Sequence, residues 1–106
     1  MTIAIVILNW NGRQLLEHFL STVLTHAAGA QVYVADNAST DSSVDFLRTH
    51  YPQVSILQNP TNEGYAAGYN RALQQVQADV YCLLNSDVAV TEGWLSPVLK
   101  CFEDPQ

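Results

Sequence analysis

The chain has 106 residues, of which 48% are hydrophobic and 13% charged. This length fits one domain with a single core, and the apolar fraction excludes a disordered or low-complexity chain. Ten acidic against four basic side chains give a formal net charge of -6. That charge argues against nucleic acid or an anionic membrane surface as a partner, because neither would attract the chain. Acidic side chains can instead hold a divalent cation.

The first apolar run, residues 3–8, predicts a buried strand. It lacks the basic segment and cleavage site of a signal peptide and is too short to span a bilayer, so we expect a soluble, cytoplasmic chain. Apolar residues at helical spacing then predict an amphipathic helix that ends near Gly29. Its expected inward-facing residues are Leu15, Leu16, Phe19, Leu20, Val23 and Leu24.

A second strand, residues 32–35, precedes a second helix. We expect Thr40 or Asp41 to cap the free amides of its first turn. The helix ends at Tyr51-Pro52, because the residue before a proline avoids the helical region. Its expected buried residues are Val44, Phe46 and Leu47.

The same alternation continues to the end of the sequence. Apolar runs at 54–57 and 80–84 predict two more strands, and helices are expected over 64–76 and 92–102. Nearly continuous apolar runs, such as 3–8 and 80–84, are typical of parallel strands covered on both faces. Short strand–helix connections therefore predict an α/β domain over residues 1–106. Its Rossmann-like parallel sheet should have the order 3-2-1-4 and flanking helices.

A cluster of polar residues follows each predicted strand, at 9–12, 36–41, 59–64 and 85–87. The carboxyl ends of parallel strands meet at one edge of a sheet, where ligands bind. Any one cluster alone is typical of turn and helix-cap chemistry. The second is unusual because it carries five polar side chains where one cap needs one acceptor. The third precedes a helix containing Gly68, whose small size permits a close approach of a ligand or backbone.

The most informative polar residue is Asp87, which closely follows the last apolar run. A carboxylate there needs a positive partner to offset its desolvation. Two interpretations stay open: a salt bridge with Arg71, or a divalent cation whose shell is completed by phosphate oxygens and water.

Several site classes have no matching motif. There is no phosphate-binding loop, no zinc spacing and no nucleophile elbow, so serine-type and zinc-type hydrolysis are set aside. The three histidines (His18, His26 and His50) are interpreted as surface residues. Cys82 lies in an apolar run and is expected to act as a small hydrophobe, with a disulfide to Cys101 as the weaker alternative.

Taken in order, the clusters resemble those of family 2 glycosyltransferases with the GT-A fold, in particular the rhamnosyltransferase-like branch. The matching segments are Asn-Trp-Asn-Gly at 9–12, Val-Ala-Asp-Asn-Ala-Ser-Thr-Asp at 34–41, Asn-Glu-Gly-Tyr-Ala-Ala-Gly-Tyr-Asn at 62–70 and Leu-Leu-Asn-Ser-Asp-Val at 83–88. The resemblance covers essentially the whole chain.

The resemblance implies roles for individual residues. Asp87 would be the ligand of a divalent cation, Mg²⁺ or Mn²⁺, and Asn85 stands where the family's D-x-D motif has its first acid. Asn37 replaces the second acid of an Asp-Asp pair, which leaves the base preference open. The implied nucleotide-binding residues are Leu8, Asn9, Asn11, Asp36, Asn37, Gly64, Asn70, Asn85 and Ser86.

The resemblance also implies a function. The parent protein would transfer a sugar, with inversion, from a UDP-, dTDP- or GDP-linked donor to a glycan or lipid-linked acceptor in cell-wall or cell-surface glycan synthesis, at the cytoplasmic membrane face. The general base and acceptor site are expected beyond Gln106, so these residues alone would be inactive and would self-associate through the 80–84 edge. Two alternatives remain: a non-catalytic nucleotide-binding or interaction domain, and a nucleotidyltransferase-like domain.

Overall fold

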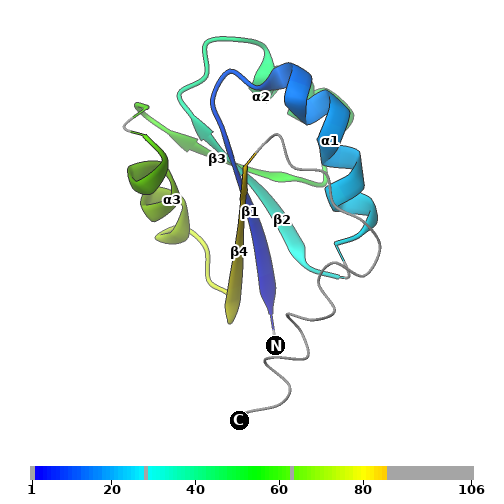
Figure 1. The fold of residues 1–106 in the computed structure, drawn as a ribbon, viewed down its shortest axis with the longest axis vertical. Coiled ribbons are helices and arrows are strands. Elements are labelled where there is room, and N and C mark those ends of the chain that lie inside the picture. Colours follow the sequence, from blue (N-terminus) through cyan, green and yellow to red (C-terminus); the bar gives the residue numbers. More distant parts are fainter. Residues whose placement is uncertain (1, 28, 63, 86–106) are drawn as a thin grey trace.

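The computed structural model describes residues 2–27, 29–62 and 64–85 (Figure 1). Within these residues the chain alternates strictly between strands and helices. The elements are β1 (Ile3–Asn9), α1 (Arg13–Thr25), β2 (Gln31–Asn37), α2 (Ser43–His50), β3 (Ser55–Asn59), α3 (Tyr65–Leu73) and β4 (Val80–Asn85). The predicted helix over 92–102, together with Ser86, Asp87 and Cys101, lies outside the described residues.

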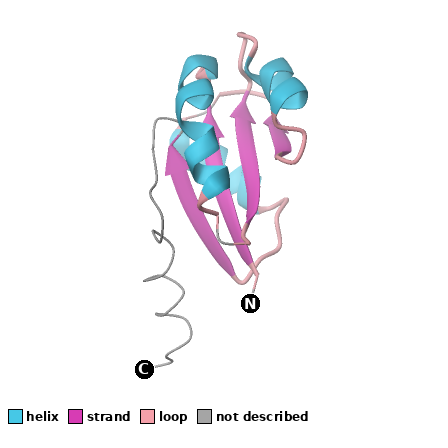
Figure 2. Cartoon of the chain, turned by 90° about the vertical axis from the view of Figure 1, so that its right-hand side faces the viewer, coloured by secondary structure: helices cyan, strands magenta, loops and turns pink. Residues whose placement is uncertain are grey.

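The four strands form one parallel sheet in the order β3-β2-β1-β4, which confirms the predicted topology. The register places Asn9 opposite Asp36, Asn37 opposite Asn59, and Leu8 opposite Asn85. Figure 2 shows the strands running in one direction, so their carboxyl ends meet at one edge. The polar clusters at these ends are therefore neighbours.

The helices cover both faces of the sheet (Figure 1), because successive strand residues point to opposite sides. On one face α1 and α2 pack Leu16, Leu20 and Leu47 against Ile5 and its neighbours. The opposite core cluster consists of Ala4, Val6, Leu8, Ala35, Ala72 and Val76, the last two from α3 and the turn after it. Residues 4–9 of β1 are buried on both faces, as expected for a central parallel strand.

Strand β4 departs from the prediction that it is covered on both faces. Tyr81 is 38% exposed and Leu83 is 45% exposed. Both lie on the face that carries α3, and α3 packs mainly over β1, β2 and β3. The Tyr69 hydroxyl donates a 2.6 Å hydrogen bond to the Leu84 carbonyl and ties α3 to the end of β4. The apolar run was read correctly as a strand, but its position at the end of the described sheet leaves one face open.

The helices differ from the predictions in detail. Helix α1 buries Leu16, Leu20 and Val23, but Leu15 is 39% exposed because the apolar stripe is narrower than predicted. Helix α2 begins at Ser43 and ends before Tyr51, and Val44 is only half-buried. The range predicted for the third helix, 64–76, is too long: regular helix stops at Leu73.

Two smaller expectations concern single side chains. Cys82 is a free, half-buried thiol that packs beside the α1–α2 core, and burial raises its pKa. His18 and His50 are exposed, as predicted, whereas His26 is half-buried. In the described part of the chain, the helices are too short or too polar to cross a membrane.

Candidate functional site

The carboxyl edge of the sheet brings together most of the residues singled out from the sequence. Leu8 and Asn9 end β1, Asp36 and Asn37 end β2, and Asn85 ends β4 beside Leu8. The other three described candidates are Asn11 in the turn before α1, Gly64 at the start of α3 and Asn70 on the exposed side of its second turn. Ser86 and Asp87 lie outside the described residues.

One group of side chains, here called the acidic cluster, consists of Asn9, Asn11, Asp36, Ser39 and Asp41. At its buried centre, Asp36 accepts hydrogen bonds from Asn9 Nδ2 at 3.0 Å, from Ser39 Oγ at 2.7 Å and from the Ser39 N–H at 3.0 Å. Asn9 is 0% and Asp36 3% exposed. Because charge-assisted bonds are the stronger ones, this carboxylate is the anchor of the loop after β2.

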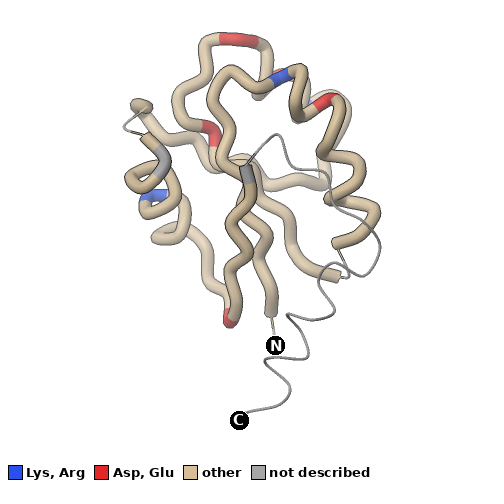
Figure 3. The backbone as a smooth tube through the Cα atoms, in the orientation of Figure 1, with Lys and Arg blue, Asp and Glu red and all other residues tan. Residues whose placement is uncertain are grey.

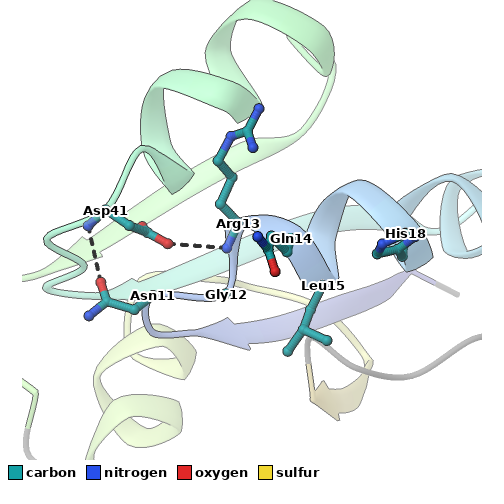
Figure 4. Close-up of a pocket in the computed structure, with 7 residues that line it drawn as sticks. All are labelled: Asn11, Gly12, Arg13, Gln14, Leu15, His18 and Asp41. Atoms are coloured by element: carbon teal, nitrogen blue, oxygen red, sulfur yellow. Dashed lines mark hydrogen bonds between the residues drawn. The ribbon is translucent and has the colours of Figure 1, made fainter.

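The outer half of the acidic cluster locks two loops together. Asn11 Oδ1 accepts hydrogen bonds from the backbone N–H groups of Thr40 and Asp41, at 2.7 and 3.1 Å. In return, Asp41 Oδ2 accepts from the Arg13 N–H at 3.2 Å (Figure 4). The turn before α1 and the loop before α2 thus satisfy each other's backbone donors, which helix starts otherwise leave unpaired.

Backbone geometry explains the residue types in these loops. Asn11 has φ of 50° and Ala38 has φ of 61°, both in the left-handed region. Asparagine tolerates this region, but alanine does so only under constraint, at a cost of about 1 kcal/mol or more. The bonds from Ser39 to Asp36 supply that constraint, since they fix the residue directly after Ala38.

Asp41 also binds the start of α2, although Ser42 occupies the N-cap position and the helix begins one residue later than with Asp41 as the cap. Its Oδ1 accepts hydrogen bonds from the N–H and the hydroxyl of Ser43. Partial burial acts to raise the pKa of the Asp41 carboxyl, but the bonds from Ser43 and Arg13 outweigh it and hold that pKa below its ordinary value. The carboxylate is therefore ionised at neutral pH. Figure 3 shows acidic residues in red along the loop between β2 and α2.

A second group, here called the amide chain, joins three asparagines on the other side of β2. Asn59 Nδ2 donates to Asn37 Oδ1 at 3.1 Å, and Asn37 Nδ2 donates to Asn62 Oδ1 at 2.7 Å. Asn62 Oδ1 also accepts from the Gly64 N–H at 3.0 Å. At the opposite end, Asn59 Nδ2 donates to the Gly68 carbonyl at 3.3 Å. The amide chain therefore fastens the first half of α3 to the ends of β2 and β3.

Gly68 lies where α3 closely approaches the sheet. A Cβ at this position would lie 2.8 Å from Leu8 Cδ1 and 3.2 Å from the Asn37 amide atoms. The sequence predicted a close approach at Gly68 by a ligand or backbone. The structure instead places two side chains there, both from residues that the resemblance assigns to nucleotide binding.

A pocket of about 430 Å³ adjoins the acidic cluster at the start of α1 (Figure 4). It is lined by Asn11, Gly12, Arg13, Gln14, Leu15, His18 and Asp41. Its charged groups already have partners: the Arg13 guanidinium lies 3.4 Å from Glu17 and 5.1 Å from the centre of the Phe46 ring. The pocket therefore lies beside the interlocked loops, and its charged side chains are held by other residues of the protein.

The fit of a metal ion depends on the donor set. Among residues 2–27, 29–62 and 64–85, no three His, Cys, Asp or Glu side chains gather as a metal site would require. The buried carboxylate of Asp36 already accepts three hydrogen bonds from Asn9 and Ser39. The described residues therefore do not form a metal centre, and the predicted ligand Asp87 lies outside them.

The sequence alone assigns no individual role to three residues of these clusters: Ser39, Asn59 and Asn62. Each lies at or just after the end of a strand, and each forms a hydrogen bond to a residue at least 22 positions away. A search for asparagine and serine at the ends of successive predicted strands would have found them, because those ends converge.

Comparison with known proteins adds independent findings. The family model described as glycosyl transferase family 2 matches residues 4–106. A pre-mycofactocin glycosyltransferase of Mycobacterium tuberculosis is 34% identical over 88 residues, which cover 81% of this chain and 18% of that protein. The chain thus spans less than a fifth of this relative's length.

Solved structures with the same fold include the mannosyltransferase PcManGT of Pyrobaculum calidifontis, in complex with GDP-Man and Mn²⁺. It is 20% identical with a TM-score of 0.85, over 97% of this chain and 32% of that one. TarS of S. aureus, residues 1–349 with UDP-GlcNAc, is 18% identical with a TM-score of 0.83, over 97% and 31%. Both matches confirm the predicted GT-A arrangement of the sheet and helices.

Proposed function

The chain belongs to glycosyl transferase family 2, and from that premise we propose that it binds the nucleotide of a nucleoside diphosphate-sugar. The parent enzyme would then transfer the sugar to an acceptor. The chain covers about a third of each matched structure. We therefore assign the acceptor site and the general base to parts of the enzyme that these residues do not include.

The observation that carries this proposal is the arrangement of strands and hydrogen-bonded loops at the carboxyl edge of the sheet. The sheet order β3-β2-β1-β4 makes β1 the point where connections pass to opposite faces, and ligands of open α/β sheets bind at such a point. The loops after β1 and β2 are interlocked there, and the amide chain holds the start of α3 beside them. A preorganised edge of this kind lowers the ordering cost of binding.

Burial refines the proposed roles of the candidate residues. The side chains of Asp36 and Asn37 are 3% and 2% exposed and hydrogen-bonded within the protein. We propose that they shape the base and ribose subsite, with direct contacts from the backbone at Leu8 and Asn9 and from Asn11. The proposed residues on the diphosphate side are Gly64 and Asn70. We place Ser86 near the ribose, and Asn85 stands in place of the first acid of the family's D-x-D motif.

We propose Mg²⁺ or Mn²⁺ as the cofactor, with Asp87 as its ligand. The Mn²⁺ in the mannosyltransferase complex and the resemblance of 83–88 to the family motif support this. Such a cation stabilises the negative charge that forms on a departing diphosphate. The proposed donors are UDP-, dTDP- or GDP-linked sugars. The finer assignments are also proposals: the rhamnosyltransferase-like branch, inversion, cell-surface glycan synthesis and work at the cytoplasmic membrane face.

Titration calorimetry with UDP, dTDP and GDP tests the proposal, each with Mg²⁺, with Mn²⁺ and with a chelator. We expect one nucleotide to bind best and its affinity to fall about tenfold or more without the metal, since the described edge carries no basic phosphate clamp. Asp87→Ala should match the chelator result, and Asp45→Ala, at an exposed site on α2, should match the unchanged chain. Absence of binding to all three nucleotides would refute the proposed function. Equal binding in chelator would refute the metal alone.

A further inference from the structure

We propose that Asn62 is a positioning residue of the donor site. Its side-chain oxygen sets where the start of α3, on the diphosphate side, lies relative to the end of β2, on the base and ribose side. This inference rests on the nucleotide-binding function proposed above. It concerns a residue to which the sequence assigned no role.

The geometry centres on a single atom. Asn62 Oδ1 accepts hydrogen bonds from Asn37 Nδ2 at 2.7 Å and from the Gly64 N–H at 3.0 Å. Asn37 belongs to β2 and Gly64 precedes the first residue of α3. Asn37 Nδ2 also donates a longer bond, at 3.4 Å, to the Gly64 carbonyl. The Asn62 oxygen therefore provides the shorter link between the two sides of the proposed nucleotide site.

Both partners are groups that need this acceptor. Asn37 is 2% exposed, so its amide cannot exchange Asn62 for bulk water at low cost. Gly64 has φ of 94°, a backbone conformation that side-chain-bearing residues rarely adopt, and its N–H is held by a side chain two positions earlier. Loss of the Asn62 oxygen would leave this turn, which sets the first residues of α3, with only the longer bond from Asn37 Nδ2 to the Gly64 carbonyl.

Other bonds of the amide chain attach α3 to the sheet at a second point. Asn37 Oδ1 accepts from Asn59 Nδ2, which also donates to the Gly68 carbonyl within α3. The first half of α3 is thus tied to the sheet at two places, Gly64 and Gly68. Without Asn62, the Gly68 end stays fastened, while the Gly64 end keeps only the 3.4 Å bond from Asn37 Nδ2 to the Gly64 carbonyl. We expect the helix to remain folded while its N-terminal end shifts.

Paired ligands separate a positioning role from general destabilisation. The probes are UDP with uridine, dTDP with thymidine and GDP with guanosine, titrated with Mg²⁺ at constant salt. For the best-bound base, Asn62→Ala should lower affinity for the nucleoside diphosphate by about tenfold, because two hydrogen bonds are lost. The nucleoside should lose less, since the acidic cluster and the end of β1 are untouched.

Asn62→Asp is the matched variant, because both bonds are accepted by Oδ1 and a carboxylate oxygen can accept them as well. We expect it to bind the nucleoside like the unchanged chain. Its new charge should weaken diphosphate binding at low salt, and this loss should shrink as salt rises. The loss in Asn62→Ala should not depend on salt. Gln53→Ala, at an exposed position before β3, serves as the control.

The outcomes distinguish this inference from the function on which it rests. If the unchanged chain binds none of the nucleotides, the proposed function and this inference fall together. If it binds and folded Asn62→Ala binds the diphosphate equally well, only the positioning role is overturned. The same holds if Asn62→Ala loses diphosphate and nucleoside affinity in equal proportion, or if the Ala and Asp variants lose the same affinity at every salt concentration.

Discussion

The acidic cluster and the amide chain lie on opposite sides of β2's end, and they stabilise loops by different chemistry. In the acidic cluster the carboxylates of Asp36 and Asp41 receive bonds from two loops on the α1–α2 face. In the amide chain three asparagines pass bonds toward α3, and none of them ionises. Charge-assisted bonds are the stronger kind, whereas amide bonds do not depend on pH. The two sides of the proposed nucleotide site should therefore differ in strength and in their response to acid.

The largest effect should come from the centre of the acidic cluster. Asp36→Ala removes three hydrogen bonds, leaves the Ser39 N–H without its acceptor and leaves buried Asn9 Nδ2 with only its 3.3 Å bond to Ser39 Oγ. We expect the free energy of unfolding to fall by about 3 kcal/mol, measured by urea denaturation at neutral pH. Glu17→Ala, in an exposed pair with Arg13, should change it by less than about 0.5 kcal/mol. A loss below about 1 kcal/mol in Asp36→Ala would show that Asp36 does not anchor the loop.

A smaller loss should follow from filling the space at Gly68 beside the amide chain. In an open helix Gly→Ala gains about 1 kcal/mol of helix propensity. Here the added Cβ meets Leu8 Cδ1 at 2.8 Å and the Asn37 amide at 3.2 Å. Overpacking in a tight core costs about 1–3 kcal/mol, so Gly68→Ala should lose about 1 kcal/mol net.

The control for Gly68→Ala lies in the same helix. Ala66→Gly, at an exposed position of α3, should lose about 1 kcal/mol through propensity alone. Denaturant unfolding of both variants separates the two effects. A stabilised Gly68→Ala variant would show that the amide chain and Leu8 move away from the added Cβ at little cost in free energy. In that case, the close contact would be no constraint on α3.

The acidic cluster and the amide chain also show which features could be predicted from the sequence and which could not. The sheet order and the meeting of polar loops at one edge follow from strand–helix alternation, which is a local pattern, together with the handedness rules for parallel strands. The bonds between Asn11 and Thr40 and between Asn62 and Asn37 do not follow from it, because these partners are 29 and 25 residues apart along the chain. Which of several adjacent asparagines and serines meet depends on the register, and that is known only once the strands are paired.

Other differences between prediction and structure also depend on segments that are distant along the chain. The exposure of Leu83 depends on which strands and helices lie beside β4, and an apolar run gives no information on that. Asp36 and Asn37 lie at the end of β2 on the carboxyl edge, as the sequence predicted, and their nucleotide-binding role stays a prediction. Their burial, and so their use in holding loops, comes from side chains of other segments that reach them.

The smallest expected effect is a difference in acid response. The pKa of Asp41 lies below its ordinary value of 3.8 in the folded chain. Its contribution to stability is therefore fully present above pH 3.8 and is lost as the pH falls through the lower, folded value. Asp41→Asn should flatten that part of the curve when denaturation midpoints are measured from pH 7 down to about pH 2.

A second carboxylate and the amide chain make this test specific. Asp79, at the opposite end of the sheet, also has a pKa below its ordinary value, because the Thr2 N–H and hydroxyl donate to it. Asp79→Asn should therefore flatten the same acid range, and its effect should add to that of Asp41→Asn because the two sites share no partner. Asn62→Ala removes bonds between groups that do not titrate, so it should lower the whole curve in parallel without changing its slope. If Asn62→Ala altered the acid slope as much as Asp41→Asn does, the two sides of β2 would be coupled through the loops and would not differ in their response to acid.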